Sequence, residues 1–181
     1  MTRLQRAAII IDLIENLHTN RSWCGETHVQ KAAYFLQHLL GVPLEFDFIL
    51  YKHGPFSFDL SDELTAMRGD MLLTLKLQDP YGPSILIGQG GERIRDLYPK
   101  TIAKYSKKVR FVANELGAKN VAELERLATA LYVTLGNGQD GTVESRVENL
   151  VKLKPHILHD QAQEAVSAVD RIRKKADTVD I

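Results

Sequence analysis

The sequence predicts a mainly helical α+β fold with short stretches of β structure. Apolar residues recur at intervals of three and four over most of the chain, which is the period of an amphipathic helix. The interruptions contain short aromatic or aliphatic segments bounded by proline and glycine, as strands often are. With 181 residues, 44% of them hydrophobic, the chain is long enough to bury a core of its own.

The first two helices are expected over residues 3–18 and 27–41. Apolar residues follow one side of the first helix, and Asp12 belongs to its polar, wetter side. Thr27 and Gln30 have the spacing of a capping box, so the second helix is expected to begin at Thr27. A glycine ends it.

A strand, a turn and a third helix are expected next. Residues 46–52 are aromatic and aliphatic, which fits a short buried strand that stops at the turn of residues 52–55. Apolar residues at helical spacing then predict a helix over residues 56–67. Ser57 or Asp59 is expected to cap that helix.

Two more strands are expected over residues 71–77 and 84–87. Residues 79–83 between them are of the types that favour a turn, so the two strands form a hairpin. Helix, strand, helix and hairpin is the order of a winged helix-turn-helix, with this hairpin as the wing. The glycine-rich stretch of residues 88–91 is interpreted as the exit from the wing, and a short segment over residues 92–97 follows.

About four helices are expected in the C-terminal part of the chain. Pro99 is a favourable first residue for the helix over residues 99–116. That helix and the next, over residues 121–135, are predicted to form an antiparallel hairpin packed on the rest of the fold. Thr142 is the expected cap of the following helix, and the last runs from about residue 159 to 176. The sequence therefore predicts a winged-helix-like core over residues 1–98 and a helical region over residues 99–181, with a soft boundary.

Composition excludes several classes of function. The 23 basic and 23 acidic residues balance, so there is no overall attraction to nucleic acid or to an anionic membrane. Cys24 is the only cysteine, which rules out an internal disulfide and a cysteine-built zinc site and suits a reducing compartment. Acidic and amide residues interrupt the apolar run near the N-terminus too early for a signal peptide or a membrane span. We therefore expect a cytoplasmic protein.

Three motifs between residues 27 and 95 resemble those of a known family. Residues 29–35 (VQKAAYF), residues 51–57 (YKHGPFS) and the helix of residues 59–67 are similar to the SocA-like, or Panacea, antitoxin domain. Residues 154–157 (KPHI) are similar to its YwgA-like bacterial relatives. The resemblance implies a bacterial protein that binds a protein partner, such as a toxin encoded nearby, and that has no catalytic activity of its own.

The turn of residues 52–55 and the exposed side of the third helix are the predicted partner-binding surface. Aromatic residues gather there beside acids, a combination often found at protein interfaces. Because these acids repel phosphate, this helix is not expected to read DNA. The residues assigned to the surface are Lys52, His53, Phe56, Phe58, Asp59, Asp62 and Glu63.

A nucleic-acid-binding regulator is the alternative interpretation. Seven basic residues against two acids lie between residues 92 and 110, which is the one clear charge asymmetry of the chain. A helix would place several of them on one side. That side is either a face that binds phosphate or an acidic protein, or an ordinary solvated face, and the solvated face is favoured. The residues assigned to this face are Lys100, Lys104, Lys107, Lys108 and Arg110.

No catalytic, metal or cofactor site is predicted. An imidazole at His53 is able to serve as an acid, a base or a ligand, but a structural turn is favoured there. His156 is interpreted as a cap or surface histidine, and Cys24 as a bystander without a nearby activating group. No arrangement of nucleophile, base and orienting group can be assembled from the sequence.

Overall fold

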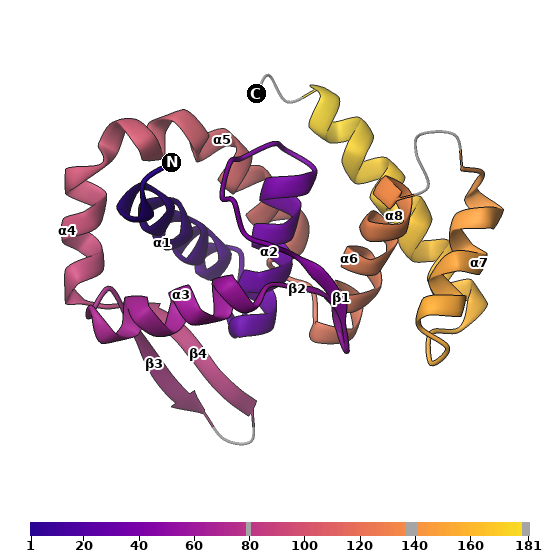
Figure 1. The fold of residues 1–181 in the computed structure, drawn as a ribbon, viewed down its shortest axis with the longest axis horizontal. Coiled ribbons are helices and arrows are strands. Elements are labelled where there is room, and N and C mark those ends of the chain that lie inside the picture. The colour runs from indigo at the N-terminus through magenta and orange to yellow at the C-terminus, as the bar shows by residue number, and fades with distance from the viewer. Residues whose placement is uncertain (79–80, 137–140, 179–181) are drawn as a thin grey trace.

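The computed structural model describes residues 1–78, 81–136 and 141–178 (Figure 1). Within these residues the fold is mainly helical with two antiparallel two-stranded hairpins, which confirms the predicted class. None of the described helices has the length and apolar character needed to cross a bilayer. The elements in chain order are α1 (Arg3–Thr19), α2 (Glu26–His38), β1 (Ile49–Tyr51), β2 (Gly54–Phe56), α3 (Phe58–Gly69), β3 (Leu73–Gln78), β4 (Tyr81–Ile87), α4 (Gln89–Leu97), α5 (Pro99–Leu116), α6 (Val121–Gly136), α7 (Val143–Leu153) and α8 (His159–Thr178).

Helix α1 lies at the centre of the N-terminal half, where α2, α4, α5 and β4 pack around it. Thr2 caps it through a capping box with Gln5. All eight residues of 7–14 are buried. The prediction that Asp12 lies on a wetter side was therefore wrong, because α1 has neighbours on several sides and Asp12 is only 7% exposed.

Helix α2 begins one residue earlier than expected. Gly25 is its N-cap and offers no side-chain bond, so the predicted capping box at Thr27 is wrong. The helix ends at His38, before the predicted Gly41. A φ of +64° at Gly41 places it in the left-handed region that glycine adopts easily, which lets the chain turn back along α2.

The first hairpin differs from the prediction in its second strand. β1 covers only the last part of the expected strand, and the chain turns at Lys52 and His53 into β2, which the sequence analysis missed. Gly54 has a φ of +83°. The Cα partners across the hairpin are Ile49 with Phe56, Leu50 with Pro55, and Tyr51 with Gly54.

Helix α3 begins at Phe58 rather than at Phe56, because β2 occupies the preceding residues. The hydroxyl of Ser57 accepts a hydrogen bond from the N–H of Leu60, which confirms one of the two predicted caps. Helix α3 then runs along one side of the N-terminal half, between the two hairpins (Figure 1).

The second hairpin is formed by β3 and β4, as predicted. The expected turn over residues 79–83 lies partly outside the described residues. The glycines interpreted as the exit from the wing belong instead to the beginning of α4. A Cβ atom on Gly88 would lie 2.4 Å from the carbonyl oxygen of Met71, so the chain passes too close for any side chain there.

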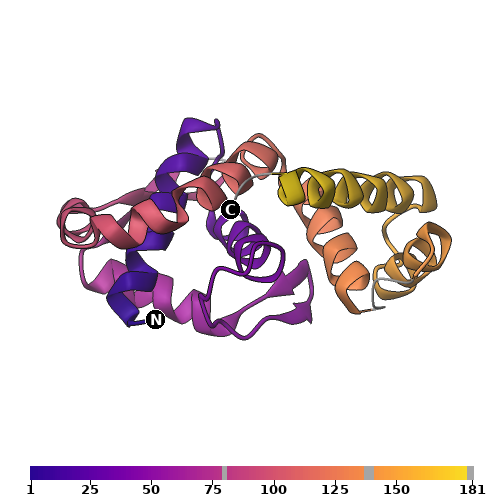
Figure 2. The ribbon, with the colours of Figure 1, turned by 90° about the horizontal axis from the view of Figure 1, so that it is seen from above.

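The C-terminal helices do not pair as expected. Helix α5 packs along α1 and α2, whereas α6 packs against α2, β2, α7 and α8, so the predicted antiparallel hairpin of α5 and α6 was wrong. Tyr105 and Val109 belong to the buried stripe of α5, and the main neighbours of that helix are α1 and α2. Figure 2 shows α5 in the N-terminal half and α6, α7 and α8 beside it. Tyr98, at the predicted boundary, is both the C-cap of α4 and the N-cap of α5.

Candidate protein-binding surface around the first hairpin

Side chains of α2 hold the outer edge of β2. The side chain of Gln30 both donates to and accepts from the backbone of Ser57, at 2.8 and 3.0 Å. The next residue, Lys31, extends its Nζ to the carbonyl oxygen of Pro55 at 2.8 Å. Gln30 is 0% exposed and Lys31 is 2% exposed, so the last strand of the hairpin is fixed from inside the protein.

A buried charge cluster lies beneath the turn of the same hairpin. Lys154, just after α7, donates from Nζ to the carbonyl oxygens of Tyr51 and Lys52, both at 2.6 Å. Its Nζ lies 3.8 Å from Oε1 of Glu125, a buried residue of α6. The carboxylate of Glu125 therefore joins α6 to the residue that holds the turn.

Burial makes the ammonium group of Lys31 lose its proton more easily than an exposed lysine does. Loss of hydration lowers the pKa of its ammonium to about 8, while the negative charge of Glu125 opposes this shift and the positive charge of Lys154 adds to it. A buried cation beside a second cation is costly unless a carboxylate lies between them. We infer that Glu125 is the residue that allows both lysines to reach the hairpin.

Two histidines meet Glu125 from the solvent side. Nδ1 of His53 lies 3.5 Å from Oε2, and Nε2 of His156 lies 3.2 Å from Oε1. Both imidazole side chains are 61% exposed. His53 thus lies in the predicted turn, and the fold brings it close to His156, which the sequence analysis interpreted as a cap or surface histidine.

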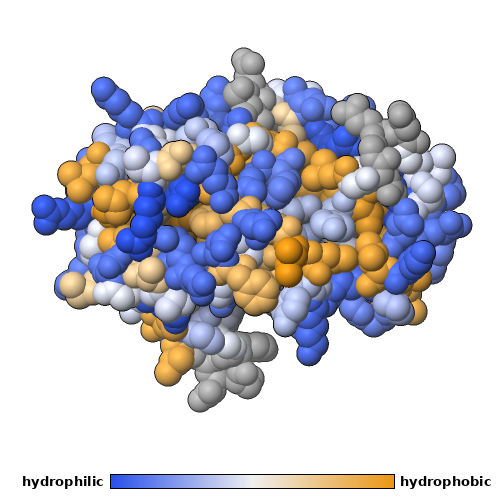
Figure 3. Space-filling view, in the orientation of Figure 1, coloured by the Kyte–Doolittle hydropathy of each residue, from blue (hydrophilic) through white to orange (hydrophobic). Residues whose placement is uncertain are grey.

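Exposed apolar side chains cover the outer face of the hairpin and the start of α3. The rings of Tyr51, Phe56 and Phe58 lie within 5.1 to 5.9 Å of one another, centroid to centroid. Tyr51 is 53% exposed, Phe58 is 52% exposed and Ile49 is also exposed. Figure 3 shows hydrophobic surface where this hairpin reaches the outside. We call Ile49, Tyr51, Phe56 and Phe58 the hairpin patch.

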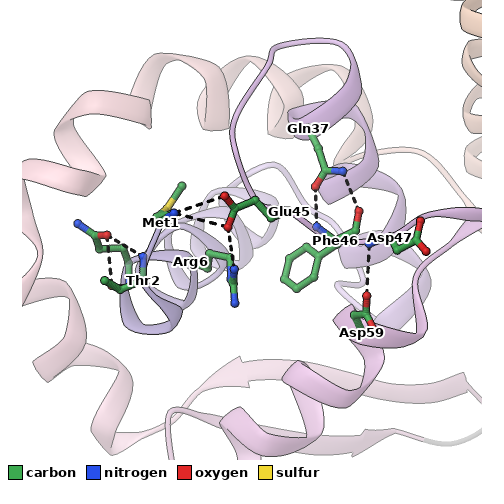
Figure 4. A network of polar contacts seen from close by, with 9 residues as sticks. Met1, Thr2, Arg6, Gln37, Glu45, Phe46, Asp47 and Asp59 are labelled. Carbon is green, nitrogen blue, oxygen red and sulfur yellow. Dashed lines mark hydrogen bonds and ion pairs between the residues drawn. The ribbon is translucent and has the colours of Figure 1, made fainter.

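The acids assigned to the same surface have different environments. Glu63 is paired with Arg3, whose Nε lies 3.0 Å from Oε1, so it is occupied within the chain. Asp59 accepts a hydrogen bond of 3.4 Å from the N–H of Asp47, as Figure 4 shows. Asp62 is exposed, and no hydrogen bond or ion pair reaches it from the residues that the structure describes.

The segment that leads into β1 is also held in place. Gln37 of α2 donates to the carbonyl oxygen of Phe46 at 2.8 Å and accepts from its N–H at 3.0 Å. Glu45, one residue earlier, pairs with Arg6 of α1 at 3.0 Å (Figure 4). Both ends of the hairpin are therefore anchored to the core.

The sequence analysis identified exposed residues of this region but not the buried residues that hold the hairpin in place. It chose Lys52 and His53 in the turn and the aromatic residues beside them. It assigned Gln30 to a capping box and included Lys31 and Lys154 only as members of the family motifs, and it did not consider Glu125. Lys31 lies in the middle of a strongly apolar helical segment. This position could have indicated a buried contact, because a buried lysine normally needs a specific partner.

The basic residues assigned to nucleic acid lie on α5. Lys100, Lys104 and Arg110 are exposed, as is Lys107. Lys108 is half-buried and donates from Nζ to the carbonyl oxygen of Leu40 at 2.8 Å, so its charge serves the end of α2. Of the five assigned cations, four are therefore exposed to solvent and one is half-buried.

A separate cavity of about 750 Å³ opens between α2, the second hairpin and the beginning of α6. Trp23, the only tryptophan of the chain, lines it together with His28. Burial lowers the pKa of His28. None of the residues assigned to a site from the sequence lies in this wall.

Cys24 and the acidic and histidine residues show no sign of metal binding in the described part of the chain. No group of three or more histidine, cysteine, aspartate or glutamate side chains there is placed to hold a metal ion. Cys24 is fully buried, and burial raises the pKa of its thiol to about 12. The reactive thiolate form is therefore disfavoured.

The geometry thus defines a mainly helical protein that presents an aromatic hairpin on a rigid support. No protein-family model matches the chain, and no curated protein matches its sequence.

Proposed function

We propose that this protein acts by binding another protein through the hairpin patch and the neighbouring acids, without catalysing a reaction. The observation that carries the proposal is a cluster of three aromatic rings, exposed at Tyr51 and Phe58 and half-buried at Phe56, on and beside a hairpin whose backbone is fixed by buried side chains. Exposed aromatic residues supply much of the binding energy at interfaces. A surface that is already ordered loses little conformational entropy when a partner binds.

The family resemblance indicates which class of protein to expect. It implies an antitoxin-like or accessory regulator in bacteria, with a toxin encoded nearby as the partner. Asp59 and Asp62 at the border of the hairpin patch would favour a partner with a basic rim around an apolar centre, because opposite charges steer association.

Photo-crosslinking inside the cell tests the proposal. A benzophenone amino acid replaces Asp62, and the chain is produced from its own gene in its natural host. We expect one dominant crosslinked protein. The double variant Tyr51→Ala and Phe58→Ala should lose that product. Leu97→Ala should keep it, because Leu97 is 60% exposed on α4, and that helix lies away from the first hairpin (Figure 1).

Two results would overturn the proposal. One is the absence of any crosslinked protein with the benzophenone at position 62. The other is a product of unchanged yield in the double variant, with circular dichroism showing that the variant is folded.

Nucleic-acid binding through α5 is the second candidate function, favoured by its four exposed cations. Such binding should weaken steeply as salt increases, since bound phosphates release counterions. Charge reversal at Lys100 and Lys104 should abolish a gel shift with duplex or single-stranded oligonucleotides. If wild-type protein gives no salt-sensitive shift, this candidate is excluded.

A further inference from the structure

The antiparallel register determines which way the backbone of β1 points. Leu50 lies opposite Pro55, and proline has no N–H to donate. Leu50 and Pro55 therefore cannot form the pair that exchanges two hydrogen bonds, and the hydrogen-bonded pairs are those on either side. Because the two kinds of pair alternate along a hairpin, the N–H and C=O of Leu50 point away from β2.

The opposite strand supports this assignment. In the same alternation the carbonyl of Pro55 points away from β1, and it is there that Lys31 donates to it at 2.8 Å. Ser57 points the same way, and Gln30 occupies both of its backbone groups. The outer edge of β2 is therefore closed by side chains of α2.

The outer edge of β1 has no such cover. Within the part of the chain that the structure describes, no hydrogen bond from outside the hairpin reaches the N–H or the C=O of Leu50. The only described element that packs closely on β1 is β2. Lys154 covers the turn end, at the carbonyls of Tyr51 and Lys52. An edge with free backbone groups and flanking apolar side chains can accept an added strand.

Charges around this edge are unequal at its two ends. Exposed Asp47 precedes β1, and the side chain of Asp59 approaches the backbone of Asp47 from α3. Asp62 lies one helical turn further along α3 and is unpaired among the described residues. Lys52 lies at the other end. An added segment would therefore be favoured if it carries lysine or arginine beside the acidic end.

We propose that the outer edge of β1 binds an extended segment of the partner protein as a third strand, with basic residues of that segment facing Asp47, Asp59 and Asp62. The proposal rests on the proposed protein-binding function and specifies how the partner is recognised. Backbone hydrogen bonds to Leu50 would set the register, and alternate side chains of the segment would pack beside Ile49 and Tyr51.

Synthetic peptides of about six residues provide defined probes. One alternates valine with lysine or arginine, and a second has the same apolar residues with glutamate in place of the basic ones. Two further versions of the basic peptide carry one backbone N-methyl group, either at a residue whose N–H would meet Leu50 or at its neighbour, whose N–H would point to solvent. Amide chemical shifts and hydrogen exchange of the full chain report binding.

We expect the basic peptide to bind, to shift and protect the amide of Leu50, and to bind more tightly than the acidic peptide. N-methylation at the residue facing Leu50 should weaken binding about tenfold or more, because a backbone hydrogen bond is lost and a group is left unpaired. N-methylation at the neighbouring residue should change the affinity little. The variant Leu50→Pro should also lose binding, but the N-methyl pair decides the question even if that variant does not fold.

Several outcomes would overturn the proposal. They are no binding of the basic peptide, equal binding of the acidic one, or equal effects of the two N-methyl groups. A dimer of the chain that forms without peptide and disappears in Leu50→Pro would assign this edge to a second copy instead. If crosslinking at position 62 still captures a partner in any of these cases, the proposed function stands and only the strand-addition inference fails.

Discussion

Gln30 pairs with the backbone of Ser57 as a neighbouring strand would, through one accepted and one donated hydrogen bond of 3.0 and 2.8 Å. Two turns further along α2, Gln37 forms the same pair of bonds with Phe46. Gln30 thus holds Ser57, just after β2, and Gln37 holds Phe46, a short distance before β1. The hairpin is thus attached to α2 at both ends, and this attachment keeps the hairpin patch in a defined place.

The two glutamines differ in burial, which leads to a first prediction. Gln30→Leu should lower the free energy of unfolding by about 2 to 4 kcal/mol, because two buried backbone groups of Ser57 are left without partners. Gln37→Leu should cost less, about 1 kcal/mol, because the two hydrogen bonds between Gln37 and Phe46 are only partly buried. Urea denaturation of both variants measures the difference. Equal losses would show that burial does not decide the cost.

Much of the fold could be predicted from the sequence because periodicity and local signals agree. Ser57, Pro99 and Thr142 take the helix-start positions expected of them, since these positions depend on neighbouring residues only. The strand β2 was missed because it contains only three residues, too few for a pattern. The pairing of α5 and α6 was wrong because an apolar stripe does not identify its partner helix.

Only the exposed residues of the candidate site could be predicted from the sequence. Tyr51 and Phe58 drew attention as aromatic residues among acids. The support depends on residues about 90 to 125 positions from Lys31, such as Glu125 and Lys154, which approach Lys31 only after the chain has folded. Sequence spacing holds no information on such a contact, so the charge cluster could be found only from the structure.

Lys31 gives a prediction about alkaline pH. Its pKa is lowered to about 8 in the folded protein from 10.5 in the unfolded chain, so the unfolded chain binds more protons between these values. The free energy of unfolding should therefore rise between about pH 8 and pH 10.5. The contribution is on the order of 3 kcal/mol at ~1.36 kcal/mol for each pKa unit.

Lys31→Met should remove this rise, whereas Lys152→Met, at an exposed lysine of α7, should retain it. Urea denaturation at a series of pH values gives the slopes. Parallel slopes in wild type and Lys31→Met would mean that Lys31 titrates normally in the folded protein.

The entry into α4 gives a prediction about close packing. A Cβ atom at Gly91 would lie 2.5 Å from Cγ2 of Ile87 and 2.6 Å from the carbonyl oxygen of Leu72. Gly91→Ala should therefore destabilise the protein by about 1 to 3 kcal/mol through overpacking.

Gly69 in α3 is the matched control, because a Cβ atom there meets nothing within 4 Å. Gly69→Ala should leave stability unchanged or raise it by up to about 1 kcal/mol, since alanine restricts the unfolded chain. Thermal unfolding of the two variants separates them. A midpoint unchanged by Gly91→Ala would show that β4 and α4 can move apart without cost.

Asp12, in the middle of α1, gives a prediction near neutral pH. Burial, together with the charge of Glu15, raises the pKa of its carboxyl to about 6, although Arg95 and Arg110 oppose the shift. One of its carboxylate oxygens, Oδ2, has no hydrogen-bond partner among the described residues, while Oδ1 accepts from Asn16 at 3.2 Å. The ionised form is therefore poorly satisfied inside the protein.

Asp12→Asn should stabilise the protein at pH 7, because the amide has no charge to bury and its oxygen can still accept from Asn16. The folded protein binds more protons than the unfolded chain between pH 3.8 and about 6, so the cost of the wild-type carboxylate grows across this window and is complete above it. We expect a gain of up to about 3 kcal/mol at pH 7, at ~1.36 kcal/mol for each pKa unit, and little gain below pH 4. Asp96→Asn, at an exposed carboxylate of α4, should show no such dependence. Urea denaturation at pH 4 and pH 7 tests this, and a gain of equal size at both values would show that the stabilisation comes from something other than the buried charge.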